Sequence, residues 1–235
     1  MSPKLSPEVV SSMARRNFLR TAAVGTVITA LGGATWALAD EDPRTKQKRG
    51  DGRVRLPPGQ RLLSSMKAMG GDPGDPSTSA FRFKVSGEVD APFEVDFDGL
   101  LALPQSDIVC DVHCVTGWSA FDLKWRGVLL SEIAKKAKVR GAAKHVIFEA
   151  ANGYTANVPL KEALVPGVGI VHQLDGKPIP RKHGPPARSL VPDLYFWKSA
   201  KWVTGVRFVA KDEPGYWETR GYHNHADPWT EERYG

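Results

Sequence analysis

Cysteine is scarce in this sequence, and the positions of the two cysteines argue against three common uses of the residue. Cys110 and Cys114 are the complete set in 235 residues. They form neither Cys-x-x-Cys nor Cys-x-x-Cys-His, so a thioredoxin-like redox pair and a covalently attached c-type haem lack support. If both lie on one strand, their Cα atoms are about 13 Å apart at ~3.3 Å per residue. A disulfide spans at most roughly 7 Å, so we expect two free thiols.

Nucleotide-binding motifs and a strongly basic face are missing as well. Neither Gly-x-x-x-x-Gly-Lys-Ser/Thr nor Gly-x-Gly-x-x-Gly occurs, which argues against a nucleotide in a standard phosphate-binding loop. The formal net charge is +6, but residues 1–39 hold four basic residues and one acidic residue, which leaves 28 basic and 25 acidic residues, or about +3, in the remainder. We therefore expect no nucleic-acid partner. The one dense basic run, Arg44–Arg61, is interpreted as a solvated tail.

The N-terminal 39 residues have the pattern of an export signal. Ala14-Arg15-Arg16-Asn17-Phe18-Leu19-Arg20 precedes an uncharged run that ends at Ala37-Leu38-Ala39, a small-x-small cleavage pattern. The arginine pair resembles the twin-arginine signal, which carries folded proteins out of the cytoplasm. We predict a signal peptide over 1–39 and a periplasmic or extracytoplasmic location, with an uncleaved anchor as the alternative. Export in the folded state suits a cofactor that is inserted in the cytoplasm.

The rest of the chain predicts a strand-rich α+β protein with one core. A hydrophobic fraction of 41% over this length is enough for one sizeable core. Residues 40–80 are rich in Pro, Gly and charge and are predicted as an extended lead-in, so we place the domain at 81–235. Helical spacing occurs once, at 129–138, with Gly141 expected to close the helix. Strands are expected at 81–85, 93–97, 108–115, 145–148, 154–158, 169–174 and 200–209.

Cys114 is the residue of greatest chemical interest. Alternation over Ile108–Val115 predicts a strand, and Gly117 predicts a sharp turn directly after it. Cys114 would then be held by a sheet and open onto a loop, where its thiolate could bind a metal. His113 should point to the opposite face, and the usual zinc spacing is absent. An inert buried cysteine is the alternative for both thiols.

Two later segments predict an anion-binding site. The prolines of Arg181-Lys182-His183-Gly184-Pro185-Pro186-Ala187-Arg188 should fix the directions of His183 and Arg188, and a fixed guanidinium suits phosphate. In Trp197-Lys198-Ser199-Ala200-Lys201-Trp202, a strand would place Ser199 and Lys201 on one face. Ordinary basic surface loops are the alternative for each segment.

In this order, Cys114-Val115-Thr116-Gly117-Trp118-Ser119, Trp125-Arg126-Gly127-Val128, His183 to Arg188 and Ser199-Ala200-Lys201-Trp202 resemble the molybdopterin-binding domain of the sulfite oxidase family, especially its small haem-free bacterial members. The resemblance covers residues 80–235. It implies a molybdenum-molybdopterin cofactor, with Cys114 as the molybdenum ligand. It implies that His183, Arg188, Ser199 and Lys201 hold the pterin and its phosphate. The family's active-site tyrosine falls on Tyr222, for which packing of an aromatic tail on the core is the alternative.

The sequence also departs from this family. Ser119 stands where sulfite oxidases place a substrate-binding arginine, and neither the immunoglobulin-like dimerisation domain nor a haem domain is found. We therefore expect a monomer that exchanges electrons with an external cytochrome or membrane haem protein. Arg126, Arg220 or His223 could restore positive charge. A sulfoxide is at least as plausible a substrate as sulfite, although the Asn-rich segment of the methionine-sulfoxide-reducing relatives is not found in 40–80.

The leading hypothesis is an exported molybdopterin-dependent oxidoreductase that transfers an oxygen atom on a small sulfite-like or sulfoxide-like substrate. Ser119 favours the main alternative, a cofactor- or ligand-binding module of the same fold without turnover. A periplasmic structural protein with inert cysteines is the third hypothesis. His223 and His225 are interpreted as part of a polar tail or pocket rim and not as a metal pair.

Overall fold

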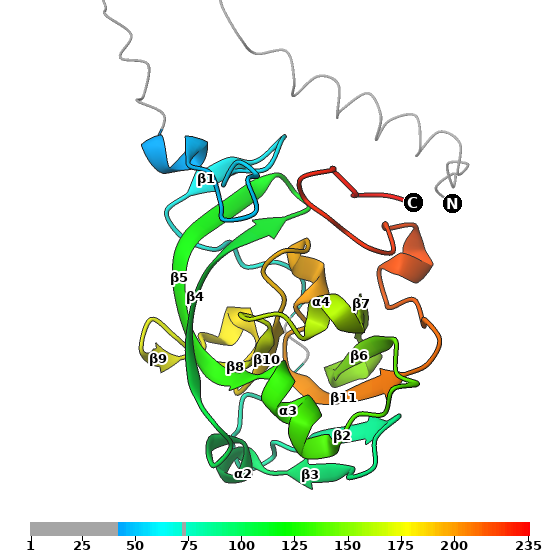
Figure 1. Ribbon diagram of the computed structural model, residues 1–235. Helices are drawn as coiled ribbons and strands as arrows, with labels where there is room; N and C mark the ends of the chain where they lie inside the picture. Colours follow the sequence, from blue (N-terminus) through cyan, green and yellow to red (C-terminus); the bar gives the residue numbers. More distant parts are fainter. Residues whose placement is uncertain (1–41, 72–73) are drawn as a thin grey trace, which may run out of the picture. The chain divides into compact units, whose positions relative to one another are not determined.

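Two mixed β-sheets carry the fold, as the computed structural model shows for the residues that it describes, 42–71 and 74–235 (Figure 1). Residues 42–235 form a single compact unit. The signal predicted over 1–39 lies outside the described residues. Within the described part of the chain, no helix has both the length and the apolar character that crossing a membrane requires.

The first sheet contains the two strands that flank the turn after Cys114. Its strand order is β1-β5-β8-β10, with β4 paired to β5 and β9 paired to β8. The β4–β5 pair forms a long curved hairpin (Figure 1). β1 runs parallel to β5, and the other pairs are antiparallel. The strands are β1 (Arg61–Leu63), β4 (Ser106–Cys114), β5 (Trp118–Leu129), β8 (Gly169–Leu174), β9 (Lys177–Pro178) and β10 (Arg188–Leu190).

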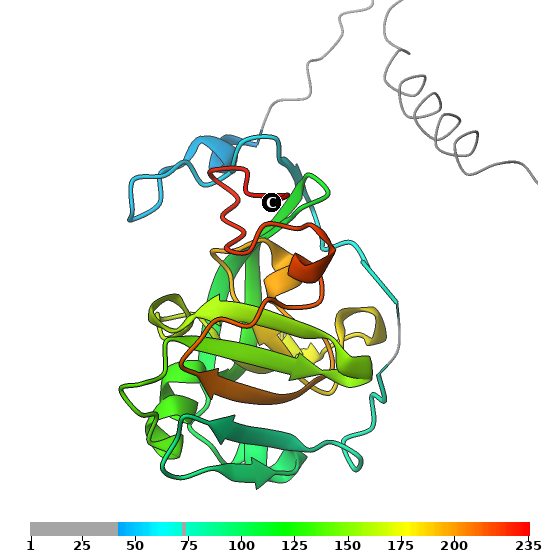
Figure 2. The same ribbon diagram turned by 90° about the vertical axis from the view of Figure 1, so that its right-hand side faces the viewer.

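The second sheet has the strand order β3-β2-β11-β6-β7, seen in Figure 2 beside the first. Its strands are β2 (Phe83–Gly87), β3 (Phe93–Val95), β6 (His145–Ala150), β7 (Thr155–Pro159) and β11 (Val203–Val209). The α-helices of the described residues are α2 (Phe97–Leu101), α3 (Leu130–Ala137) and α4 (Leu160–Ala163). The short 3-10 helices are η1 (Pro43–Lys46), η2 (Ala151–Gly153), η3 (Arg181–His183), η4 (Phe196–Lys198) and η5 (Glu218–Arg220).

The α+β prediction is confirmed, because strands dominate and few, short helices pack on them. The period-2 and helical patterns also predict the core correctly. Phe83 and Val85 of β2 are fully buried, as are Leu130 and Ile133 of α3. α3 ends earlier than predicted, however, because Lys138 adopts the left-handed conformation (φ 52°) and its N–H bonds to carbonyls of the last turn. Gly141 therefore does not close this helix.

Two other predicted elements also have different bounds. The strand expected at 200–209 begins at Val203, because η4 ends at Lys198 and Trp202 has a positive φ of 50°. Residues 198–202 instead bond to β10, where the N–H of Ser189 donates to the carbonyl of Ala200 over 2.9 Å. The expected 93–97 strand is β3 followed by α2, with Asp96 as the N-cap that accepts from the N–H of Gly99.

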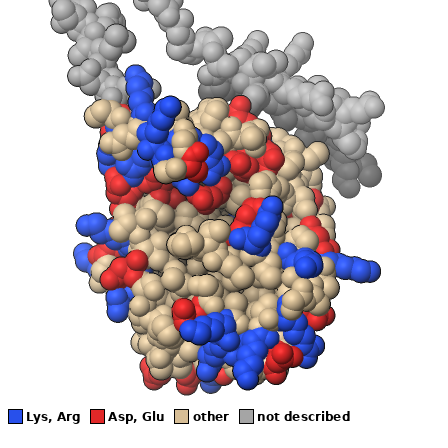
Figure 3. Space-filling model, in the orientation of Figure 1, with Lys and Arg blue, Asp and Glu red and all other residues tan. Residues whose placement is uncertain are grey.

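The basic stretch interpreted as a solvated tail is bound to the surface of the domain. Arg55 pairs with Asp111 over 2.6 Å, and Arg49 pairs with Asp193 over 2.5 Å. β1 adds a strand to the first sheet from within the predicted lead-in. Figure 3 shows basic and acidic side chains side by side over this part of the molecule. The prediction of a solvated tail was wrong, because the carboxylates that pair with Arg49 and Arg55 lie far along the sequence.

Candidate active site

A cavity of about 550 Å³ brings together all six residues singled out in the sequence. This volume is within the usual range for a cofactor or small-molecule site. The lining combines a thiol, basic side chains and aromatic rings. The lining residues include Cys114, Val115, Thr116, Lys182, His183, Arg188, Trp197, Ser199, Lys201, Trp217 and Tyr222.

Cys114 is the last residue of β4, as predicted, and its thiol faces this cavity. The residue is 7% exposed and has no disulfide partner. The chain turns directly after it, with the N–H of Gly117 donating to the carbonyl of Cys114 over 3.0 Å. Gly117 has a φ of 84°, a conformation that a side chain disfavours. Strand and turn together fix the direction of the thiol.

Arg188 is a buried cation without a carboxylate partner among the described residues. It is 1% exposed, and its guanidinium donates to the carbonyl oxygens of His183 (3.1 Å) and Ser199 (2.7 Å). The ring of Phe196 lies 4.1 Å from the guanidinium carbon. Burial lowers the pKa of Arg188 to about 9, so the group is still charged at neutral pH. A buried charge without a counterion is costly, and an anion in the cavity would compensate it.

His183 and Lys201 lie on the same wall of the cavity as Arg188. The pKa of His183 is lowered to about 4, first by burial and then by the charges of Arg188, Lys201 and Lys182. Its imidazole has no hydrogen-bond partner among the described residues. Gly184 follows with a φ of 89°, and a Cβ there would lie 2.3 Å from the Cβ of Lys201. Only glycine lets the two segments approach this closely.

Ser199 and Lys201 both line the cavity, but the reason given from the sequence was wrong. They do not share a strand face, because this segment precedes β11. The Ser199 hydroxyl oxygen accepts from the N–H of Val191 over 2.8 Å. The Nζ atom of Lys201 donates to the carbonyl oxygens of Met69 (2.7 Å) and Gly71 (3.0 Å). Lys201 therefore connects the loop before β2 to the basic wall of the cavity.

Tyr222 lines the cavity within a group of aromatic rings. Its ring centroid is 5.1 Å from that of Trp197 and 4.9 Å from that of Trp217. Burial first, and then Tyr234 and the nearby Cys114 thiol, raise the pKa of Tyr222 above its usual value of about 10. Tyr222 is therefore a neutral phenol near Cys114 at physiological pH. The sequence left a place in the active site and packing of an aromatic tail as alternatives for Tyr222. In the structure, Tyr222 both lines the cavity and packs against aromatic rings.

Ser119 does not line the cavity. It is fully buried in β5, where its hydroxyl meets Nδ1 of His113 over 2.8 Å and Oε1 of Gln60 over 3.3 Å. The three residues that could restore positive charge, Arg126, Arg220 and His223, do not line the cavity either. Arg126 pairs with Asp107 at the surface, Arg220 bonds to the carbonyl of Tyr216, and His223 accepts from the N–H of Ala226.

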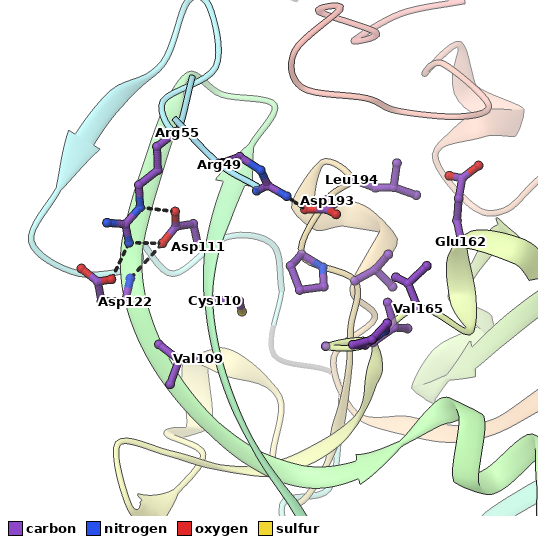
Figure 4. Close-up of a pocket in the computed structure, with 15 residues that line it drawn as sticks. Arg49, Arg55, Val109, Cys110, Asp111, Asp122, Glu162, Val165, Asp193 and Leu194 are labelled. Carbon is purple, nitrogen blue, oxygen red and sulfur yellow. Dashed lines mark hydrogen bonds and ion pairs between the residues drawn. The ribbon is translucent and has the colours of Figure 1, made fainter. Parts of the chain in front are cut away.

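Cys110 belongs to a second cavity of about 390 Å³ between β4 and residues 162–168 and 191–194 (Figure 4). Both arginines at this cavity are bound to carboxylates, Arg49 to Asp193 and Arg55 to Asp111 and Asp122. Burial raises the pKa of the Cys110 thiol, which keeps it protonated. Thus the two cysteines line different cavities, Cys110 the one whose arginines are paired with carboxylates and Cys114 the one that Arg188 also lines.

Sequence reasoning missed the residues that hold the Cys114 turn from outside it. Nε2 of Gln60 donates to the carbonyl oxygen of Cys114 over 3.2 Å, and the N–H of Arg61 donates to that of Gly117 over 3.0 Å. Arg233 donates to the carbonyl oxygen of Val115. In both ribbon views, the C-terminal segment lies beside residues 42–63 near the tip of the β4–β5 hairpin (Figure 1, Figure 2). No motif marks these residues, because they lie in polar terminal segments.

The tail histidines contact carboxylates of Glu162 and Glu232. Nδ1 of His225 meets Oε2 of Glu232 over 2.7 Å, and Nε2 meets Oε2 of Glu162 over 2.8 Å. Among the described residues, no cluster of three or more His, Cys, Asp or Glu side chains has an arrangement suited to a metal ion. Any metal at Cys114 would therefore need most of its ligands from a bound cofactor.

A thiol and the buried guanidinium of Arg188, which has no carboxylate partner among the described residues, share one cavity, an arrangement that suits an anionic cofactor carrying a metal. The family model described as "Oxidoreductase molybdopterin binding domain" matches residues 70–217. Uncharacterized oxidoreductase YuiH of Bacillus subtilis (strain 168) is 38% identical over 191 residues, or 80% of this chain and 96% of that protein. The chain therefore belongs to the family of molybdopterin-dependent oxidoreductases related to sulfite oxidase.

More distant relatives agree with this family. The protein-methionine-sulfoxide reductase catalytic subunit MsrP of Ralstonia nicotianae is 28% identical over 187 residues, 68% of this chain and 56% of that protein. Mitochondrial sulfite oxidase of Drosophila melanogaster is 30% identical over 152 residues, 53% of this chain and 26% of that protein. The chain thus spans about half of the first and a quarter of the second.

A solved structure supports the fold. The sulfane dehydrogenase SoxCD from Paracoccus pantotrophus superposes with a TM-score of 0.60 at 18% identity, covering 89% of this chain and 64% of that one. The cavity also fits the cofactor that the family implies. A buried guanidinium without a carboxylate and an unpartnered imidazole suit an anionic group, and a thiolate at Cys114 would be a soft ligand suited to the metal.

Proposed function

We propose that Cys114 binds the molybdenum of the cofactor and that His183, Arg188, Ser199 and Lys201 hold the pterin and its phosphate. The observation that carries this proposal is the single cavity that the thiol shares with the buried, uncompensated Arg188. Arg188 supplies a fixed positive charge, and the neutral imidazole of His183 supplies one donor and one acceptor. When bound, the cofactor supplies two-electron oxygen-atom transfer.

We further propose that the substrate is a neutral sulfoxide. The residues that line the cavity together with Cys114 include the uncharged side chains of Val115, Thr116, Trp217 and Tyr222. Lys201 and Arg188 also line the cavity, but they are the residues proposed to hold the phosphate of the cofactor, so neither is left to bind the sulfite dianion. The reaction would be sulfoxide + 2 H⁺ + 2 e⁻ → sulfide + H₂O. Tyr222, a neutral phenol, is the donor placed to hold a proton toward the substrate oxygen.

Three further parts of the proposal concern the cellular setting. We infer that the twin-arginine pattern exports the folded protein to the periplasm, that an external haem protein delivers the two electrons, and that the enzyme acts as a monomer. Replacing Arg15 and Arg16 together with lysine is expected to retain the protein in the cytoplasm, as measured by fractionation. Secretion of that variant at the wild-type level would contradict the export route.

Metal analysis tests the cofactor assignment. Protein made in a host that synthesises the molybdenum cofactor is expected to contain about one molybdenum atom per chain. Cys114→Ser should abolish the electron paramagnetic resonance signal of the metal while leaving the circular dichroism spectrum unchanged. Cys110→Ser is the matched control on the same strand, and it should keep both the paramagnetic resonance signal and the circular dichroism spectrum of the wild type. Wild-type protein without molybdenum, or a full signal from Cys114→Ser, would overturn the assignment.

Substrate assays test the second proposal. With a reduced viologen dye as electron donor, we expect sulfoxide-dependent dye oxidation by the wild type. With an oxidised acceptor, sulfite should give no comparable rate. Tyr222→Phe is expected to slow sulfoxide reduction by about 10²-fold or more, in line with the loss of one positioned proton donor. Efficient sulfite oxidation without sulfoxide reduction would contradict the proposed substrate.

A further inference from the structure

The hydroxyl of Thr116 lies against the sulfur of Cys114. The distance from Sγ to Oγ1 is 3.2 Å, and Thr116 lines the same cavity as the thiol. Among the described residues, no other hydrogen-bonding group contacts this sulfur. In the free thiol either atom can be the donor. A metal-bound thiolate has lost its proton, so only the threonine can then donate.

The turn that carries Thr116 is held in place by four hydrogen bonds. The carbonyl oxygen of Cys114 accepts from both Gly117 N (3.0 Å) and Gln60 Nε2 (3.2 Å). The carbonyl of Gly117 accepts from Arg61 N, and that of Val115 accepts from Arg233. Three of the five residues from Cys114 to Trp118 thus have their carbonyls fixed by turn, N-terminal or C-terminal groups. The hydroxyl is consequently positioned before any cofactor enters.

We propose that Thr116 is a positioning residue that sets the reduction potential of the molybdenum centre through a hydrogen bond to the Cys114 sulfur. This inference rests on the proposed ligation by Cys114. A hydrogen bond to a ligating thiolate draws electron density from the sulfur and weakens its donation to the metal. Weaker donation stabilises the reduced metal relative to the oxidised one, so the reduction potential rises. Hydrogen bonds to ligating sulfurs are an established means of tuning metal potentials.

Two variants, one of them nearly isosteric with threonine, test this role. Thr116→Val keeps the size and branching of the side chain and removes the hydroxyl, whereas Thr116→Ser keeps the hydroxyl. The midpoint potentials are measured by redox titration of the holoenzyme, followed by electron paramagnetic resonance. Thr116→Val is expected to shift them to lower values and to change the g-values of the signal. Thr116→Ser should remain close to the wild type.

The outcomes separate this inference from the proposed function. Equal potentials for Thr116→Val and the wild type, or equal shifts for the valine and serine variants, would overturn the role of the hydroxyl. If both variants contain about one molybdenum per chain and Cys114→Ser has lost the signal, the failure concerns Thr116 alone. If Cys114→Ser retains the signal, ligation by Cys114 itself is wrong, and this inference fails with it.

Discussion

Gln60 donates a hydrogen bond through Nε2 to the carbonyl oxygen of Cys114 over 3.2 Å, although 54 residues separate them. The other end of the same amide, Oε1, accepts from the hydroxyl of Ser119 at 3.3 Å. A hydroxyl has one proton, so Nδ1 of His113 must in turn donate to Ser119 over 2.8 Å. Ser119, at the position where the resemblance to sulfite oxidases would place an arginine, thus supports the backbone of the proposed ligand through Gln60.

The first prediction concerns this chain of hydrogen bonds. Gln60→Ala should lower the free energy of unfolding by about 1–3 kcal/mol, because it leaves the Ser119 hydroxyl without its acceptor in a buried site. Ser119→Ala should lower the free energy of unfolding by a similar amount, since it leaves the buried N–H of His113 without an acceptor. The double variant should be less destabilised than the sum of the two by about 0.5–1.5 kcal/mol. Urea unfolding measures all three, and strict additivity would show that the two side chains act separately.

The second prediction concerns Arg188. Arg188→Met is expected to lower the molybdenum content of the purified protein at least tenfold, because it removes the fixed cation from the proposed phosphate site. Arg126→Met is the matched control. Its guanidinium is exposed and pairs with Asp107, so molybdenum content should be unchanged and stability should move by no more than about 0.5–1 kcal/mol. An equal loss of molybdenum in both variants would point to a general effect of charge.

Much of this site follows from the sequence, and the reasons for the remainder are physical. Alternation and Gly117 place Cys114 correctly at the end of a strand. Ser199 and Lys201 line the cavity although they do not lie on a strand. The local sequence does not predict this, because the positive φ of Trp202 is imposed by packing against distant segments.

Long-range partners account for the other differences. Arg49 and Arg55 have the composition of a linker, and only the fold brings Asp193 and Asp111 to them. Gln60 acquires its role in the same way, since nothing local predicts its contact with Cys114. The motifs therefore indicate which side chains meet in the cavity, whereas the groups that hold those side chains in place depend on the fold.

The third prediction concerns a buried ion pair behind the cavity. Nζ of Lys198 lies 2.6 Å from Oε1 of Glu218, and their side chains are 0% and 2% exposed. Lys198→Met should destabilise the protein by about 3–5 kcal/mol, because it leaves a buried carboxylate uncompensated. Adding Glu218→Gln should recover part of this loss. Arg140→Met, which breaks the exposed pair with Asp90, is the control and should cost about 0–1 kcal/mol in chemical denaturation.

The last prediction is a pH dependence at His225. Burial of its ring opposes protonation, but the hydrogen bonds to Glu162 and Glu232 outweigh it and raise the pKa of His225 above 6.5. The imidazolium then donates from both nitrogens, joining α4 to the C-terminal segment. Its stabilising contribution is present in full below the unfolded pKa of about 6.5 and is lost as the pH rises through the higher folded pKa.

Unfolding curves of the wild type and His225→Gln across pH 5.5 to 9 isolate this contribution. The free energy of unfolding of the wild type should exceed that of the variant most near the acid end of this range, and the difference should shrink steadily toward pH 9. Glu162→Gln replaces one of the two carboxylates with a neutral amide and should reduce the same pH-dependent difference, because the pKa of His225 is then raised less. A gap between wild type and His225→Gln that widens with rising pH would show that the neutral imidazole is the form stabilised in the fold.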